Sequence, residues 1–120
     1  MATKVLLVDD EKEFVTHLAE RLEFRGLEVE TASEGEVALQ LIKEKAPDVM
    51  VLDLQMPGMS GIETLKQAKA LSPDLHVIML TGYGTIETAN EGKQYGAFEY
   101  LIKPCDTVKL YTLIEEAVGK

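Results

Sequence analysis

Five polar residues of this 120-residue chain share one setting, because each lies at the end of a short apolar run. They are Asp9, Asp10, Asp53, Thr81 and Lys103. Carboxylates can hold a hard cation or act as nucleophiles, and a hydroxyl or an ammonium can donate to anionic oxygens. Together these residue types suit phosphoryl chemistry, provided that the fold brings them to one place.

The apolar runs before these residues are typical of buried strands. They are short, contain β-branched residues and lack strict alternation, as in strands covered on both faces. The expected strands are Val5–Val8, Leu27–Thr31, Val49–Leu52, Leu75–Leu80 and Phe98–Ile102. Helical apolar spacing fills the segments between and after them, from Phe14 to Gly26, Ser33 to Pro47, Ser60 to Leu71, Thr85 to Tyr95 and Asp106 to Val118.

Strands that alternate with helices predict a parallel sheet covered by helices on both faces. Right-handed crossovers leave few topologies for five such units. At this length the pattern favours an α/β flavodoxin-like fold, a doubly wound five-stranded parallel sheet of order 2-1-3-4-5 with five helices. No linker or repeat divides the chain, so residues 1–120 are expected to form one domain.

Local signals predict where several helices begin and end. Ser33 with Glu36, and Ser60 with Glu63, have the spacing of capping boxes. Asp106 is expected to cap the last helix, and Gly26 to end the first.

In an open α/β sheet, ligands bind beyond the carboxyl ends of the strands, at the switch point between the first and third. Asp9, Asp10 and Asp53 are expected to meet there, with Thr81 and Lys103 opposite. Taken singly, the aspartates could be helix caps or turn residues, but the joint pattern favours a site. Their mutual repulsion favours a cation, and oxygen ligands with open positions suit Mg²⁺.

The same residues could perform phosphoryl transfer. Asp53 can be the nucleophile, since carboxylates form aspartyl-phosphates. Thr81 and Lys103 can donate to phosphoryl oxygens, and Gly82 has no side chain to obstruct their approach.

Composition excludes several other classes of function. The net charge of −9 disfavours direct binding to nucleic acid or to an anionic membrane surface. No apolar run approaches the roughly 20 residues that span a bilayer, and the N-terminus lacks the layout of a signal peptide. With Cys105 as its single cysteine the chain forms no internal disulfide, so a reducing, cytoplasmic location is expected.

The chain resembles the receiver domains of bacterial two-component response regulators along essentially its whole length. The residues that carry the resemblance are Val8-Asp9-Asp10-Glu11, Asp53-Leu54-Gln55-Met56-Pro57-Gly58-Met59-Ser60-Gly61, Thr81-Gly82 and Tyr100-Leu101-Ile102-Lys103-Pro104. These motifs arrive in the order and spacing of the family. The resemblance implies that Asp53 is the phosphoacceptor, which takes its phosphoryl group from phosphohistidine on a sensor histidine kinase or a phosphotransfer protein.

The resemblance also implies roles for the neighbouring residues. Asp10, Asp53 and the backbone carbonyl of Gln55 would hold Mg²⁺, and Asp9 would act through water. Thr81, with Gly82, would supply the switch hydroxyl, and Lys103 would pair with the phosphate. The Lys103–Pro104 peptide bond would be cis, an uncommon isomer even before proline.

Signal output would follow from a population shift. Tyr100 would be the switch aromatic, and the surface of the fourth helix, fifth strand and fifth helix would change to control an output domain or a target protein. Phosphorylation-dependent homodimerisation through that surface is a further hypothesis. The chain would then be a signalling phosphoacceptor, capable only of self-phosphotransfer and slow autodephosphorylation, rather than an enzyme.

Three other functions remain open at this point. The chain could be a pseudo-receiver, a docking module that phosphorylation does not regulate. It could be a phosphatase with an aspartyl nucleophile. Enzymes of this kind, which resemble haloacid dehalogenases, have a second aspartate as general acid two residues after the nucleophile, where this chain has Gln55. It could bind a nucleotide or a flavin, but no glycine-rich phosphate-binding motif follows any expected strand.

Overall fold

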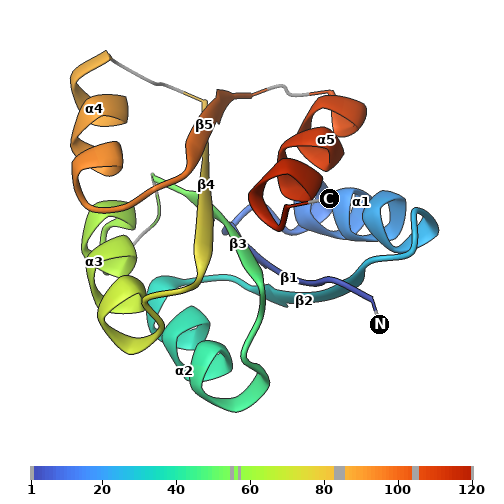
Figure 1. The fold of residues 1–120 in the computed structure, drawn as a ribbon, viewed down its shortest axis with the longest axis horizontal. Helices are drawn as coiled ribbons and strands as arrows, with labels where there is room; N and C mark the ends of the chain where they lie inside the picture. The colour runs from blue at the N-terminus through green and yellow to red at the C-terminus, as the bar shows by residue number, and fades with distance from the viewer. Residues whose placement is uncertain (1, 55, 57, 83–85, 104–105, 120) are drawn as a thin grey trace.

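A computed structural model gives the arrangement of the chain and describes residues 2–54, 56, 58–82, 86–103 and 106–119. Within that part, strands and helices alternate (Figure 1). The strands are β1 (Lys4–Val8), β2 (Glu28–Ala32), β3 (Val49–Asp53), β4 (His76–Thr81) and β5 (Glu99–Ile102). The helices are α1 (Lys12–Phe24), α2 (Gly35–Lys45), α3 (Gly61–Leu71), α4 (Ile86–Gln94) and α5 (Thr107–Ala117).

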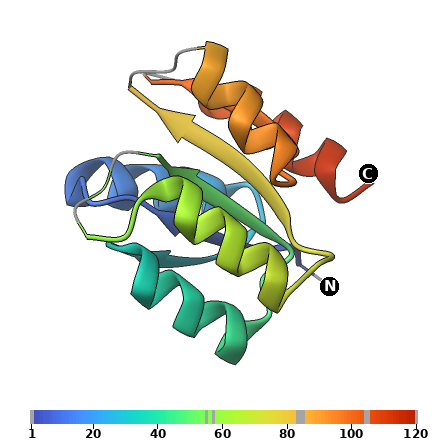
Figure 2. The same cartoon turned by 90° about the vertical axis from the view of Figure 1, so that its left-hand side faces the viewer.

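The five strands form one parallel sheet in the order β2-β1-β3-β4-β5. This order confirms the predicted doubly wound, flavodoxin-like topology. Helices α1 and α5 cover one face of the sheet, and α2, α3 and α4 cover the other (Figures 1 and 2). β1 and β3 lie side by side, so their carboxyl ends meet where the chain reverses its direction of winding.

Two hydrophobic layers hold the sheet between the helices. Val5, Leu7 and Val51 pack under α1 and α5, whereas Leu6 and Met50 pack under α2 and α3. Successive side chains on a strand point to opposite faces, so this alternation continues to the ends of the strands. Asp53 therefore shares the α1/α5 face with Val51, while Tyr100 packs against the opposite layer.

The helix starts agree with the sequence in two of three cases. The Ser60 hydroxyl accepts a hydrogen bond from the Glu63 N–H at 3.1 Å, and the Asp106 carboxylate accepts one from the Val108 N–H at 2.9 Å. The prediction that Ser33 caps α2 is wrong, because the N-cap is Glu34, whose side chain makes no capping hydrogen bond.

Packing between helices accounts for the start of α2. Gly35, its first residue, is buried, and a Cβ atom there would collide with Oγ1 of Thr64 in α3. Close contact with α3 thus requires glycine at the first residue of α2, and a local capping signal does not report such a contact. Gly26 follows the C-terminal end of α1 and has a φ of +91°. This left-handed conformation favours glycine after a helix, as the sequence predicts.

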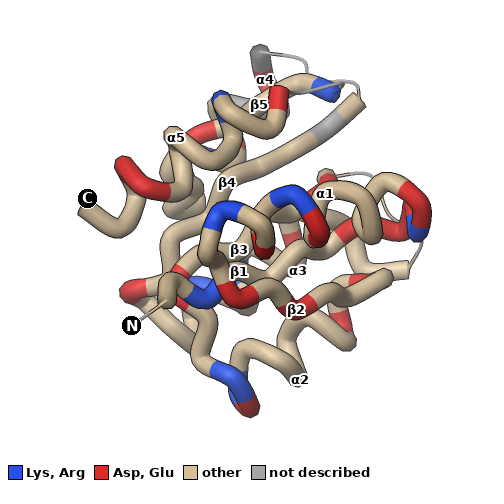
Figure 3. Tube along the Cα trace, turned by 90° about the vertical axis from the view of Figure 1, so that its right-hand side faces the viewer, with Lys and Arg blue, Asp and Glu red and all other residues tan. Residues whose placement is uncertain are grey.

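The helices carry a mixed surface, with acidic and basic residues interspersed along α1 (Figure 3). Among the described residues, no helix has both the length and the apolar character that crossing a membrane requires.

Candidate functional site

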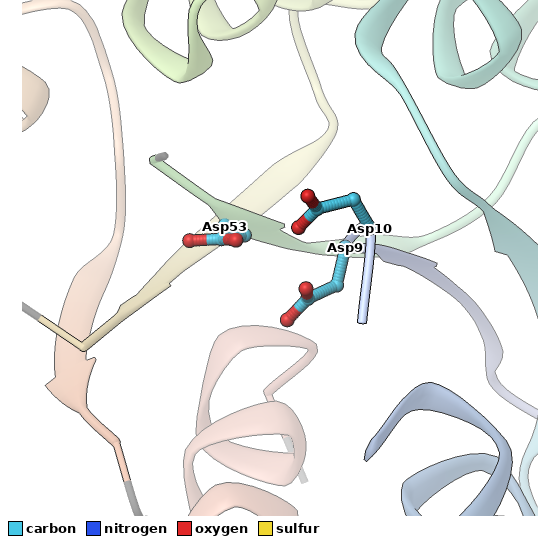
Figure 4. Close-up of side chains that lie close together, drawn as sticks. All are labelled: Asp9, Asp10 and Asp53. Carbon is cyan, nitrogen blue, oxygen red and sulfur yellow. The ribbon is translucent and has the colours of Figure 1, made fainter. Parts of the chain in front are cut away.

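Three aspartates gather beyond the ends of the two central strands. Asp9 and Asp10 follow β1 directly, and Asp53 is the last residue of β3 (Figure 4). Each offers a carboxylate oxygen, and these three oxygens lie within 4.8 Å of one another. The structure therefore brings together the acidic residues that the sequence places at the switch point.

Two of the three carboxylates are largely withdrawn from water. Asp9 is 5% exposed and Asp53 4%, while Asp10 is exposed. The Asp9 backbone N–H donates to the Ala32 carbonyl at 3.0 Å, and its Oδ1 accepts from the Glu11 N–H at 3.0 Å. These two hydrogen bonds join Asp9 to β2 and to the start of α1, so regular secondary structure positions this side of the acidic site.

Lys103 enters the same site from the end of β5. Its Nζ atom lies 2.6 Å from Oδ2 of Asp9, 2.7 Å from Oε1 of Glu11 and 3.8 Å from Oδ2 of Asp53. The Glu11 contact has the geometry of a hydrogen bond, whereas the Asp9 contact is an ion pair outside hydrogen-bond angles. The Lys103 side chain is 12% exposed, so its charge compensates the buried carboxylates of Asp9 and Asp53, whose side chains are each 5% exposed.

The charge state of Lys103 follows from these contacts. Burial alone would lower the pKa of its ammonium, but the negative charges of Asp9 and Glu11 that contact it, with attraction from Asp53, raise that pKa above its usual value. A raised lysine pKa stabilises the fold below the pKa of the unfolded chain, and this contribution is lost only as the pH rises through the folded value. Lys103 is therefore charged throughout the neutral range.

Several predicted site residues fall outside what the structure describes. They are the Gln55 backbone carbonyl, the Thr81 side chain and the peptide bond between Lys103 and Pro104. The backbone of Thr81 is described and ends β4. This strand pairs with β3, where Asp53 lies opposite Leu80, and it lies two strands from β1, which Asp9 follows. Gly82 follows it and is exposed.

Tyr100 lies away from the carboxylates, on β5. It pairs in register with Met79 of β4, is partly buried, and packs against the layer under α2 and α3. Gly92 of α4 lies directly on Met79, since a Cβ there would collide with the end of that side chain. Tyr100 thus pairs with the residue on which α4 packs.

Sequence reasoning gave no individual role to two residues that complete the site. Glu11 is one, because its partner Lys103 lies 92 positions away. Gly61 is the other: a Cβ there would approach the Leu54 Cα to 2.5 Å and the Asp53 carbonyl oxygen to 2.9 Å. Both occur within the motifs, but only the fold shows what they contact.

Comparison with known proteins identifies the family of the fold that holds this cluster of carboxylates and its lysine. The sequence model of the response regulator receiver domain matches residues 5–115. The chain belongs to this family. Its receiver fold superposes on a CheY-like response regulator receiver domain protein from Methanospirillum hungatei JF-1 with a TM-score of 0.93 and 32% identity, covering 97% of this chain and 93% of that one.

Other relatives place the receiver within longer proteins. The transcriptional regulatory protein ZraR of Klebsiella oxytoca is 40% identical over 115 residues, which cover 96% of this chain and 26% of ZraR. The chain spans about a quarter to a third of the length of such curated relatives. A Burkholderia pseudomallei response regulator, solved with a phosphorylated aspartic acid, a calcium ion and citrate, is 28% identical with a TM-score of 0.86, over 98% of this receiver and 73% of that chain.

Proposed function

We propose that this receiver accepts a phosphoryl group on Asp53 from phosphohistidine on a sensor histidine kinase or a phosphotransfer protein. The observation that carries the proposal is the setting of Asp53. Asp53 is 4% exposed and closes a central strand, and its carboxylate lies 3.8 Å from the Lys103 ammonium and beside two further aspartates. The Burkholderia relative with a phosphorylated aspartic acid supports the same chemistry.

The transfer itself requires little covalent chemistry from the protein. An Asp53 carboxylate oxygen attacks phosphorus, the new P–O bond forms, and the P–N bond to the donor imidazole breaks with its electron pair going to that nitrogen. The product has more negative charge and more acceptor oxygens than the carboxylate had. Lys103 is placed to offset that charge, since its Nζ lies 3.8 Å from Oδ2 of Asp53.

The donor set fits a bound Mg²⁺. Three carboxylates supply hard oxygens within 4.8 Å of one another. Lys103 contributes one positive charge, so the site keeps a net negative charge that a cation can offset. Asp10 and Asp53 would hold the ion, with Gln55 through its backbone carbonyl and Asp9 through water. When bound, Mg²⁺ supplies positive charge for the developing phosphoryl oxygens. Asp10, the exposed member of the set, is the residue most accessible to an incoming ion.

Output would pass through the surface formed by α4, β5 and α5. That surface carries exposed apolar side chains, with Ile102 of β5 and Val108 of α5 each 51% exposed. Apolar side chains on an otherwise charged protein favour contact with another protein surface. Movement of Thr81 and Tyr100 after phosphorylation would alter how this surface is presented, either to an output domain or target protein or to a second receiver.

This function makes the receiver a cytoplasmic signalling protein rather than an enzyme that turns over a substrate. Its own reactions are the acceptance of the phosphoryl group and slow autodephosphorylation. The longer relatives are transcriptional regulators, so control of an attached output domain is the natural use of the switch.

Intact-protein mass spectrometry tests the proposal. The wild-type protein is incubated with acetyl phosphate and Mg²⁺, beside Asp53→Asn and beside a chelator-treated sample. We expect one phosphoryl mass increment in the wild type and none in the other two. An unmodified wild type, folded by circular dichroism, would contradict the proposal and leave a pseudo-receiver docking module as the better account.

A further inference from the structure

The start of α1 places a fourth carboxylate against the predicted phosphoryl site. Glu11, the N-cap residue of α1, accepts a hydrogen bond from Lys103 Nζ at 2.7 Å. Its backbone N–H donates to Asp9 Oδ1, so the residue is tied to the site at both its backbone and its side chain. The Glu11 side chain is 62% exposed, whereas Lys103 is 12% exposed.

Lys103 is held by this carboxylate on the α1 side of the site. The Asp9 contact at 2.6 Å lies outside hydrogen-bond angles, and the Asp53 carboxylate is 3.8 Å away. The Phe14 ring, also on α1, lies under the ammonium with its centroid 4.6 Å from Nζ, close enough for a cation–π attraction. Glu11 and Phe14 therefore attract Lys103 from α1, beside its ion pair with Asp9, and Asp53 is the most distant of its three carboxylate partners.

We propose that Glu11 is a positioning residue that holds Lys103 in its resting place and competes with a phosphoryl group for the Lys103 ammonium. The inference rests on the proposed phosphorylation of Asp53 and adds a control of its stability. A phosphoryl group on Asp53 would bring new acceptor oxygens to the side of Lys103 where Nζ lies 3.8 Å from Asp53 Oδ2, and these oxygens would compete with Glu11 for the same ammonium protons. Any weakening of the Glu11 contact thus favours the phosphorylated form.

Three variants separate this contact from a general charge effect. Glu11→Gln removes the charge, and Glu11→Asp keeps the charge but shortens the side chain by one methylene. Glu13→Gln removes a carboxylate from the same first turn of α1, and Glu13 is not among the described carboxylates that lie within 4.0 Å of Lys103 Nζ. The measurement is the dissociation constant of beryllofluoride, a phosphoryl analogue, at saturating Mg²⁺, followed by NMR on the whole chain.

We expect Glu11→Gln and Glu11→Asp each to bind beryllofluoride roughly threefold more tightly than the wild type, the size of one partly exposed charged contact. Glu13→Gln should bind as the wild type does. Two results would overturn the inference: unchanged affinity in Glu11→Gln, or tightening in Glu11→Gln with wild-type affinity in Glu11→Asp. The second result would mean that only the charge near the site matters.

A second readout needs no metal or phosphoryl analogue. Ammonium protons of a lysine held in an ion pair exchange slowly enough with water to give a ¹⁵N-correlated signal. We expect this signal for Lys103 in the metal-free wild type and in Glu13→Gln, and its loss in Glu11→Gln; a signal retained in Glu11→Gln would overturn the inference. A wild type that shows the signal but neither binds beryllofluoride nor gains phosphoryl mass would instead refute the proposed function.

Discussion

Replacing Gly61 with alanine should displace the phosphoacceptor, because the first residue of α3 touches the backbone beside Asp53. An alanine Cβ would lie 2.5 Å from the Leu54 Cα and 2.9 Å from the Asp53 carbonyl oxygen. The Cβ and the Leu54 Cα must separate by roughly 0.9 Å to reach the 3.4 Å at which ordinary contact begins. Both obstacles are backbone atoms, so no side-chain rotation can relieve the overlap.

The displacement sets the size of two effects. Overpacking of this kind costs about 1–3 kcal/mol of the free energy of unfolding, more than the gain of up to about 1 kcal/mol that alanine brings to a helix. A shift of about 1 Å in a reacting group can reduce a rate by about 100-fold. Gly61→Ala should therefore lose stability in urea denaturation, and its initial rate of phosphorylation by acetyl phosphate should fall by at least about tenfold.

Two other glycines provide matched controls. A Cβ on Gly82 meets no atom within 4 Å, so Gly82→Ala should match or slightly exceed the wild type in stability. A Cβ on Gly92 would meet only the end of the flexible Met79 side chain, so Gly92→Ala should cost less than Gly61→Ala. If Gly61→Ala were as stable and as rapidly phosphorylated as the wild type, the argument that α3 positions Asp53 would be refuted.

The remaining predictions concern a helix cap, the carboxylate cluster and one surface ion pair. Ser60→Ala should lower the free energy of unfolding by about 1 kcal/mol in urea, since its hydroxyl accepts the Glu63 N–H at the start of α3. Asp10→Asn should raise the melting temperature of the metal-free protein by reducing repulsion, and should diminish the rise that Mg²⁺ causes in the wild type; a full Mg²⁺ effect in the variant would contradict its role as a ligand. The hydrogen bond from Lys93 lowers the pKa of Glu99, so this pair stabilises the fold above the usual carboxyl pKa and ceases to do so as the pH falls through the lowered value. Lys93→Ala should thus be less stable than the wild type at neutral pH by only about 0.2–0.5 kcal/mol, because both side chains are exposed, and a difference that persists at low pH would contradict this origin.

The sequence is sufficient to predict the sheet order and the place of the acidic cluster, for a physical reason. Buried parallel strands are apolar on both faces, so Val5–Val8 and Val49–Leu52 stand out, and the first polar residue after each marks its carboxyl end. Their order then brings Asp9, Asp10 and Asp53 together without any knowledge of side-chain geometry. The structure confirms that prediction, because one carboxylate oxygen from each of the three residues lies within 4.8 Å of the other two.

Contacts between distant segments could not be predicted in this way. Ser33 has the spacing of a cap, but the N-cap of α2 is Glu34, and the first residue of the helix, Gly35, packs closely on Thr64 of α3. The hydrogen bond from Lys103 to Glu11 joins positions 92 residues apart. Neither contact leaves a periodic signal, because each depends on how two elements meet rather than on either element alone.

The most direct test of the account is to locate the phosphoryl group within the chain. The protein is phosphorylated with acetyl phosphate and Mg²⁺, reduced with borohydride to convert an aspartyl-phosphate to homoserine, digested and sequenced by tandem mass spectrometry. The account predicts homoserine at position 53 alone. Homoserine at position 9 or 10, or its absence from a sample that carries a phosphoryl mass increment, would contradict the assignment of Asp53 as the acceptor.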